Sequence, residues 1–125
     1  MERNDDEGLM RAIAEAVLEP YRSDPRMERL MLFAALEGQE TALNHYRTVA
    51  LPIYELLRDY IVRRQQEGAL AGFHPAAILT AIAGMAQHYA HSTRLLRLHS
   101  EFSDGEAVET FTRILMDGIH PRATK

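Results

Sequence analysis

His88 and His91 are the first residues whose types and spacing could do chemistry, because an i, i+3 pair places both imidazoles on one helix face. A zinc site needs at least a third protein ligand, and a helical di-iron site needs Glu-x-x-His twice. No Glu stands three residues before any histidine here, and cysteine is absent. We therefore expect no metal and no cofactor, and we interpret the pair as partly buried imidazoles on a helix seam. A metal carrier or small helical enzyme using them is the alternative.

Serine and glycine patterns also fail to indicate catalysis. Gly68 and Gly72 lead into a proline-started helix without the Lys and Ser/Thr that complete a phosphate-binding loop. No serine lies in a G-x-S-x-G elbow, and we predict loop, cap or mid-helix positions for all four, namely Ser23, Ser92, Ser100 and Ser103. We therefore expect a protein that is not an enzyme.

Aromatic and methionine side chains could instead line an apolar pocket. A tyrosine on a helix stripe is usually a core residue whose hydroxyl reaches the rim. Pro52 favours a pocket, because a proline inside a long helix is expected to kink it, here near residues 48–52, and spread helices leave a cavity. Tyr46 and Tyr54 lie on either side of this position.

Composition and charge exclude several classes of protein. The 125 residues are enough for one core without disulfide or metal support, and a formal net charge of -4 gives no basis for wrapping nucleic acid. Arginines at 58, 63 and 64 alternate with acidic residues, which predicts a solvated helix face. There is no apolar run of membrane-spanning length, and the start MERNDDEG is acidic. We expect a cytoplasmic protein that does not associate with membranes.

The elements that must position these residues all show helical periodicity, and no segment alternates like a strand. We predict an all-α fold in which a single domain, residues 9–120, lies between tails at 1–8 and 121–125. Capping residues and glycines or prolines mark the helix ends. The predicted helices are Leu9–Pro20, Pro25–Gly38, Glu40–Glu67, Pro75–Leu98, and one that begins at the Ser103 capping box and ends at Gly118 or His120.

The fourth predicted helix is apolar on all sides, because Thr80 is the polar residue between Ala76 and Ala86. A domain of this size covers one face of such a helix with its own core, so the other face needs a second cover. A partner chain is the simplest cover, and periodicity therefore predicts a homodimer.

The order of these parts resembles the C-terminal effector domain of TetR-type bacterial transcriptional regulators. The resemblance spans residues 9–119 and rests on an Asp-Pro-started helix, a long helix with an internal proline, the Gly84-Met85 pair and a closing amphipathic helix with Gly118-Ile119. A further signature is the junction x-x-Q-x-x-G-x-L-x-x-x-x-P, formed by Gln65, Gly68, Leu70 and Pro75.

The resemblance implies a domain that homodimerises through its last two helices in an intermolecular four-helix bundle and holds a small, mostly apolar effector between the earlier helices. The residues implied to approach the ligand are Phe33, Tyr46, Ile53, Tyr54, Met85 and Tyr89. Those implied to face the partner are Ala77, Ala81, Gly84, His88, His91, Phe111 and Leu115. The alternative is a constitutive helical interaction module that dimerises without a ligand.

One departure from the family is large, since its members begin with a helix-turn-helix head and no such segment precedes Leu9 in this sequence. DNA would therefore be bound only through a head that these residues do not include. The chain is expected to be either a fragment of a longer regulator or a headless relative. In the first case an effector would alter helix tilt and so the spacing of two attached heads.

Overall fold

The computed structural model describes residues 5–121, and every regular element in that range is a helix. This confirms the predicted all-α class with five α-helices, to which one short π-helix is added. The elements are α1 (Asp6–Ser23), α2 (Pro25–Leu36), α3 (Glu40–Gln66), α4 (Pro75–Ala90), the π-helix η1 (His91–Leu95) and α5 (Asp104–Ile119). None of these helices is long and apolar enough to cross a membrane.

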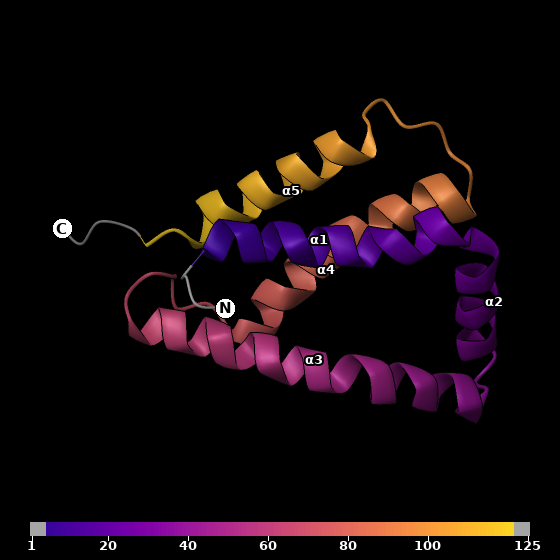
Figure 1. Cartoon of the computed structure of the whole chain (residues 1–125), viewed down its shortest axis with the longest axis horizontal. Coiled ribbons are helices and arrows are strands. Elements are labelled where there is room, and N and C mark those ends of the chain that lie inside the picture. Colours follow the sequence, from indigo (N-terminus) through magenta and orange to yellow (C-terminus); the bar gives the residue numbers. More distant parts are fainter. Residues whose placement is uncertain (1–4, 122–125) are drawn as a thin grey trace.

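Three helices form the body of the fold. In Figure 1, α1 lies across α4, α5 runs along the upper side of this pair, and α3 passes below it, while α2 stands steeply between the end of α1 and the start of α3. The core is made mainly by α1, α4 and α5, through side chains such as Met10, Leu18, Ile82, Val108 and Ile119. From α3, Ile61 joins this core, whereas α2 buries no side chain at all.

Local chemistry sets most helix ends as predicted. Asp24 accepts a hydrogen bond from the Arg26 N–H, and Pro25 occupies the first helical position, where no donor is missed. Gly38 follows α2 with φ +77°, the left-handed conformation that favours glycine. At α5, the predicted capping box is present, since Ser103 and Glu106 satisfy each other's backbone N–H groups.

Both ends of the first helix differ from the prediction. The first helix begins at Asp6, because Asp5 caps the Gly8 N–H at 2.9 Å, and it continues through Pro20 to Ser23. Proline removes one backbone hydrogen bond, but burial of Leu18 and Tyr21 on either side holds the turn in helical form. The long helix α3 likewise runs through Pro52 unbroken, as predicted.

The fourth helix changes form near its end. The predicted span to Leu98 is α-helical only to Ala90, and η1 then adds a turn of π-helix through Leu95. Arg97 follows with φ +56°, an uncommon conformation for a residue with a Cβ, and reverses the chain toward α5. Segments of π-helix are often found near functional sites.

Gln65 explains why the junction motif has its composition. Its side-chain amide donates to the carbonyls of Ala71 at 2.9 Å and Phe73 at 2.7 Å, which folds the connector back onto α3. Gly68 adopts φ +79° where α3 ends, and Leu70 is buried in the core. The motif therefore fixes the path from α3 into α4.

Candidate functional site

A hollow in the described surface lies between α2 and the start of α3. It has a volume of about 750 Å³, within the range typical of small-molecule sites, and its lining is mostly apolar. Its walls include Met27, Leu30, Met31 and Phe33 from α2 and Ala42 from α3. We refer to it as the α2–α3 groove.

Several apolar side chains of α2 are exposed to water. Leu30 and Phe33 are each more than 60% exposed, and Leu36 at the end of the helix is 78% exposed. Apolar side chains that are this exposed on one short helix form a patch in contact with water. Such a patch commonly marks a binding surface.

The charged residues that line the groove are acidic. Glu28 and Glu37 both line it, together with His45. Neither Arg nor Lys belongs to the lining. A second, smaller hollow on the far side of Leu30 and Phe33 is lined by Arg26 and Arg29. The two sides of the exposed α2 surface therefore differ in charge.

The charge of Glu28 also acts on the contact between α1 and η1. There the Tyr21 hydroxyl and the His91 Nε2 are 2.8 Å apart. Burial raises the pKa of Tyr21, and the Glu28 charge adds to that shift. Burial lowers the pKa of His91, as does the neighbouring His88, while Glu28 acts in the opposite direction. Burial therefore favours the neutral form of the His91 imidazole.

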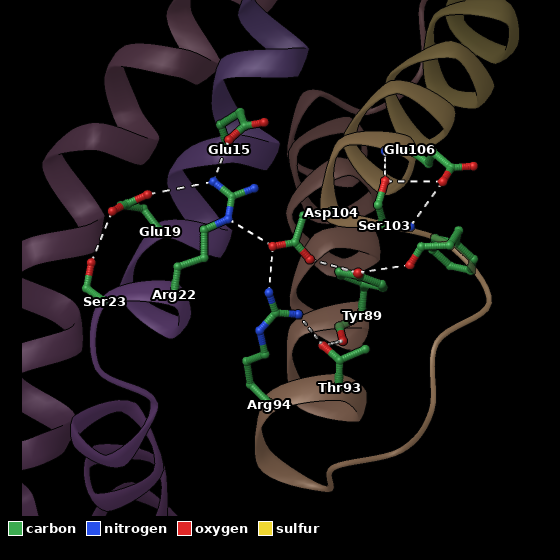
Figure 2. Close-up of polar contacts among 11 residues, drawn as sticks. Glu15, Glu19, Arg22, Ser23, Tyr89, Thr93, Arg94, Ser103, Asp104 and Glu106 are labelled. Atoms are coloured by element: carbon green, nitrogen blue, oxygen red, sulfur yellow. Dashed lines mark hydrogen bonds and ion pairs between the residues drawn. The ribbon is translucent and has the colours of Figure 1, made fainter.

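A cluster of polar side chains joins α1, α4, η1 and α5. Figure 2 shows Arg22 and Arg94 converging on Asp104, with Nε of Arg22 at 3.0 Å and Nη2 of Arg94 at 2.6 Å from the same carboxylate oxygen. The Tyr89 hydroxyl donates to the other oxygen at 2.8 Å. Burial by itself would raise the pKa of Asp104, but these three donors outweigh it and lower the pKa. Because the Asp104 carboxylate accepts from donors on α1, α4 and η1, this cluster links these helices to α5 and has a structural role.

A second polar cluster connects the start of α1 to the later part of α3. Both Nε and Nη2 of Arg64 lie 3.0 Å from the two carboxylate oxygens of Asp6, and the Tyr60 hydroxyl donates to the same carboxylate at 2.7 Å. Burial and this hydrogen bond raise the pKa of Tyr60 to about 12. Arg64 is thus mostly buried in an ion pair, and the prediction that it belongs to a solvated face was wrong.

The residues predicted to approach a ligand are not gathered at one place. Phe33 lines the α2–α3 groove, and Tyr46 lies close enough to Glu28 for that charge, after burial, to raise its pKa. Ile53 is exposed on α3, whereas Tyr54 and Met85 pack against the core.

Tyr89, the remaining predicted ligand residue, is buried. Its hydroxyl is already engaged by Asp104, and its ring stacks on Phe102, with Phe111 edge-on to both. This aromatic cluster closes the α4–α5 end of the core. In this conformation Tyr89 is a core residue.

The residues predicted to face a partner divide into an open and a covered group. Ala77, Gly84 and His88 are exposed along α4, and Ala81 is half-buried beside them. Nothing lies within 4 Å of where a side chain at Gly84 would begin. The covered group is half-buried or buried within the chain itself and consists of His91, Phe111 and Leu115.

The sequence reasoning missed the groove-lining residues Met27, Glu28, Glu37 and His45. A signal was present, because the apolar residues of PRMERLMLFAAL occupy more of the helix circumference than one packing face needs. No pattern in the sequence, however, reports the angle between α2 and α3 on which the hollow depends.

Neither a metal site among the described residues nor a similar protein indicates a function for the chain. Within residues 5–121, no three His, Asp or Glu side chains gather as metal ligands would. No protein-family model, no curated protein and no solved structure matches this chain.

Proposed function

We propose that this chain is the effector-sensing and homodimerisation domain of a TetR-type bacterial transcriptional regulator. In this proposal the α2–α3 groove receives a small, mostly apolar molecule, and α4 and α5 meet the same helices of a second copy. DNA is contacted only through a helix-turn-helix head, which is not among these 125 residues. In this proposal the domain binds the small molecule and transmits the resulting change to the head, and it performs no catalysis.

The observation that carries the proposal is the groove of about 750 Å³ beside a helix that buries no side chain. A ligand in this groove would cover apolar surface that water now contacts, which is favourable by roughly 25 cal/mol for each Å². A helix held by few buried contacts is also the element that shifts most readily when a ligand binds.

The connections of α2 supply a route for the response. It is joined to α1 through Asp24 and to α3 through Gly38, and Glu28 faces the Tyr21–His91 pair. A change in the tilt of α2 would therefore move the adjoining ends of both α1 and α3. Such a response requires a ligand that binds one dimer geometry better than the other.

The exposed face of α4 supports the dimer. Ala77, Thr80, Gly84 and His88 follow each other at helical spacing and leave a shallow strip open to water. Ile114 of α5 is also 58% exposed. Small residues on a helix let a second helix approach closely, so a second copy would cover this strip and complete the four-helix bundle.

A second candidate is a constitutive interaction module that dimerises without a ligand. It is favoured by Val49, Ile53 and Leu56, which are all more than half exposed on α3 and do not line the groove. An apolar stripe of this kind suits a partner helix better than a small molecule.

Native mass spectrometry of the purified chain, compared with its denatured mass, tests the proposal. We expect twice the chain mass, with an additional small molecule retained in part of the population. A clean dimer that also binds no neutral apolar probe would favour the interaction module. A monomer at micromolar concentration would contradict both.

A further inference from the structure

The charges of the α2–α3 groove restrict what it can hold, provided that the proposed sensing function is correct. Glu28 and Glu37 supply two carboxylates to the lining, and no Arg or Lys belongs to it. An anionic ligand would be repelled by these carboxylates, more strongly by half-buried Glu28 than by exposed Glu37, because water screens an exposed charge.

Glu28 is the more informative of the two carboxylates. It is half-buried, yet among the described residues it takes part in no ion pair and no side-chain hydrogen bond. Two other half-buried carboxylates, Asp6 and Asp104, are each paired with arginine. A carboxylate that is partly removed from water gains from a cationic partner, and Glu28 has no ion-pair partner within residues 5–121.

The apolar walls define the rest of the ligand. Phe33 offers an aromatic face, to which a cation is attracted, and Met27 and Met31 offer polarisable thioethers that adapt to irregular shapes. A volume of about 750 Å³ suits a body of several rings or a branched chain.

We propose that the α2–α3 groove binds an organic cation with an apolar body, such as a lipophilic amine, quaternary ammonium or phosphonium compound. The body lies against Leu30 and Phe33 of α2, and the positive charge is met by Glu28. Arg26 and Arg29, on the far side of Phe33, offer the opposite arrangement to a lipophilic anion, so the sign of the charge is the discriminating property.

Three probes separate this inference from the function on which it rests. Tetraphenylphosphonium and tetraphenylborate have nearly the same shape and opposite charge, and N-phenyl-1-naphthylamine is a neutral fluorescent probe of apolar sites. Titration of the full chain should show that the neutral probe binds and that the phosphonium binds at least about tenfold more tightly than the borate.

The matched variants are Glu28→Gln and Glu55→Gln, which change the net charge equally. Glu55 is exposed on α3 and lies outside the groove lining. We expect Glu28→Gln to weaken phosphonium binding by about tenfold while the neutral probe binds as before, and Glu55→Gln to leave both unchanged. Circular dichroism of both variants verifies that the helices remain.

Each result has a distinct meaning. Equal binding of the two ions, or equal phosphonium binding by the two variants, overturns the cation inference, while retained binding of the neutral probe keeps the sensor proposal. If none of the three probes binds, the groove is not a ligand site, and the sensor proposal fails together with the inference.

Discussion

Thr112 is completely buried on α5, and its hydroxyl has no hydrogen-bond partner within residues 5–121. A buried hydroxyl without a partner costs about 1–3 kcal/mol compared with a satisfied one. Valine has almost the same shape and no polar atom, so it can replace threonine without a cavity or a clash.

We therefore predict that Thr112→Val raises the free energy of unfolding by about 1 kcal/mol, as measured by urea denaturation. Thr110→Val, an exposed position on the same helix, is the matched control and should change stability by less than about 0.5 kcal/mol. A loss of stability in Thr112→Val would mean that the hydroxyl is hydrogen-bonded in solution.

Asp104 shows the opposite situation, because its carboxylate accepts hydrogen bonds from Arg94, Tyr89 and Arg22. These donors lower its pKa in the folded state. The folded protein therefore binds a proton at this site less readily than the unfolded chain does. The resulting stability is complete above the unfolded pKa of about 3.9 and is lost as the pH falls through the folded pKa.

For Asp104→Asn we predict that the free energy of unfolding at pH 7 falls by about 1–2 kcal/mol, since a charge-assisted network is lost. The difference from the unchanged protein should shrink once the pH drops below about 4, because protonation removes the same charge. Urea denaturation at a series of pH values measures this, with Asp117→Asn, an exposed acid on the same helix, as the control. A difference that stays constant down to pH 3 would contradict the assignment.

At the scale of elements, α2 stands out among the α-helices of residues 5–121, since none of its side chains is buried. By contrast, α4 buries Ile78, Ile82 and Ala86 in the core. Local opening costs little where few apolar contacts must be broken, so backbone amides there exchange hydrogen with water sooner.

We predict that peptides covering residues 25–36 take up deuterium well before peptides covering residues 75–90, when exchange is followed by mass spectrometry. Saturating amounts of a groove ligand should slow exchange in α2 more than in α4. Equal protection of the two helices in the free protein would show that something already covers α2.

Sequence patterns predicted the elements well where local chemistry sets them. The Asp24-Pro25 start and the Ser103–Glu106 capping box depend on neighbours within four residues, and both were confirmed. Pro20 misled the prediction, because core packing of Leu18 and Tyr21 outweighs the single hydrogen bond that proline removes. The π-helix after Ala90 left no local signal.

The site was harder to predict, because it depends on how helices cross. Tyr46 and Phe33 were chosen for their type, and they do lie near the groove or line it. Tyr89 was chosen for the same reason but lies in the core, where Asp104, fifteen residues away, engages its hydroxyl. The sequence does not encode such tertiary partners by spacing.

At the scale of the whole molecule, the proposed dimer determines which surfaces remain exposed to water. Gly84 lies at the centre of the open strip on α4, and a side chain added there would meet no atom within 4 Å. A glutamate at this position should also suit the helix better than glycine does. A defect of Gly84→Glu would therefore report on a partner chain and not on the fold of the single chain.

We predict that the unchanged protein is a dimer by light scattering after size-exclusion chromatography and that its melting temperature rises with concentration, as mass action requires. Gly84→Glu should have the mass of a single chain, a helical circular dichroism spectrum and a melting temperature independent of concentration, because a buried carboxylate without a partner is unfavourable at a helix interface. Gly72→Glu adds the same charge in the connector, where no atom lies within 4 Å either, and should remain a dimer. If Gly84→Glu is still a soluble dimer, the two copies meet elsewhere, and the exposed stripe of α3 becomes the next surface to test.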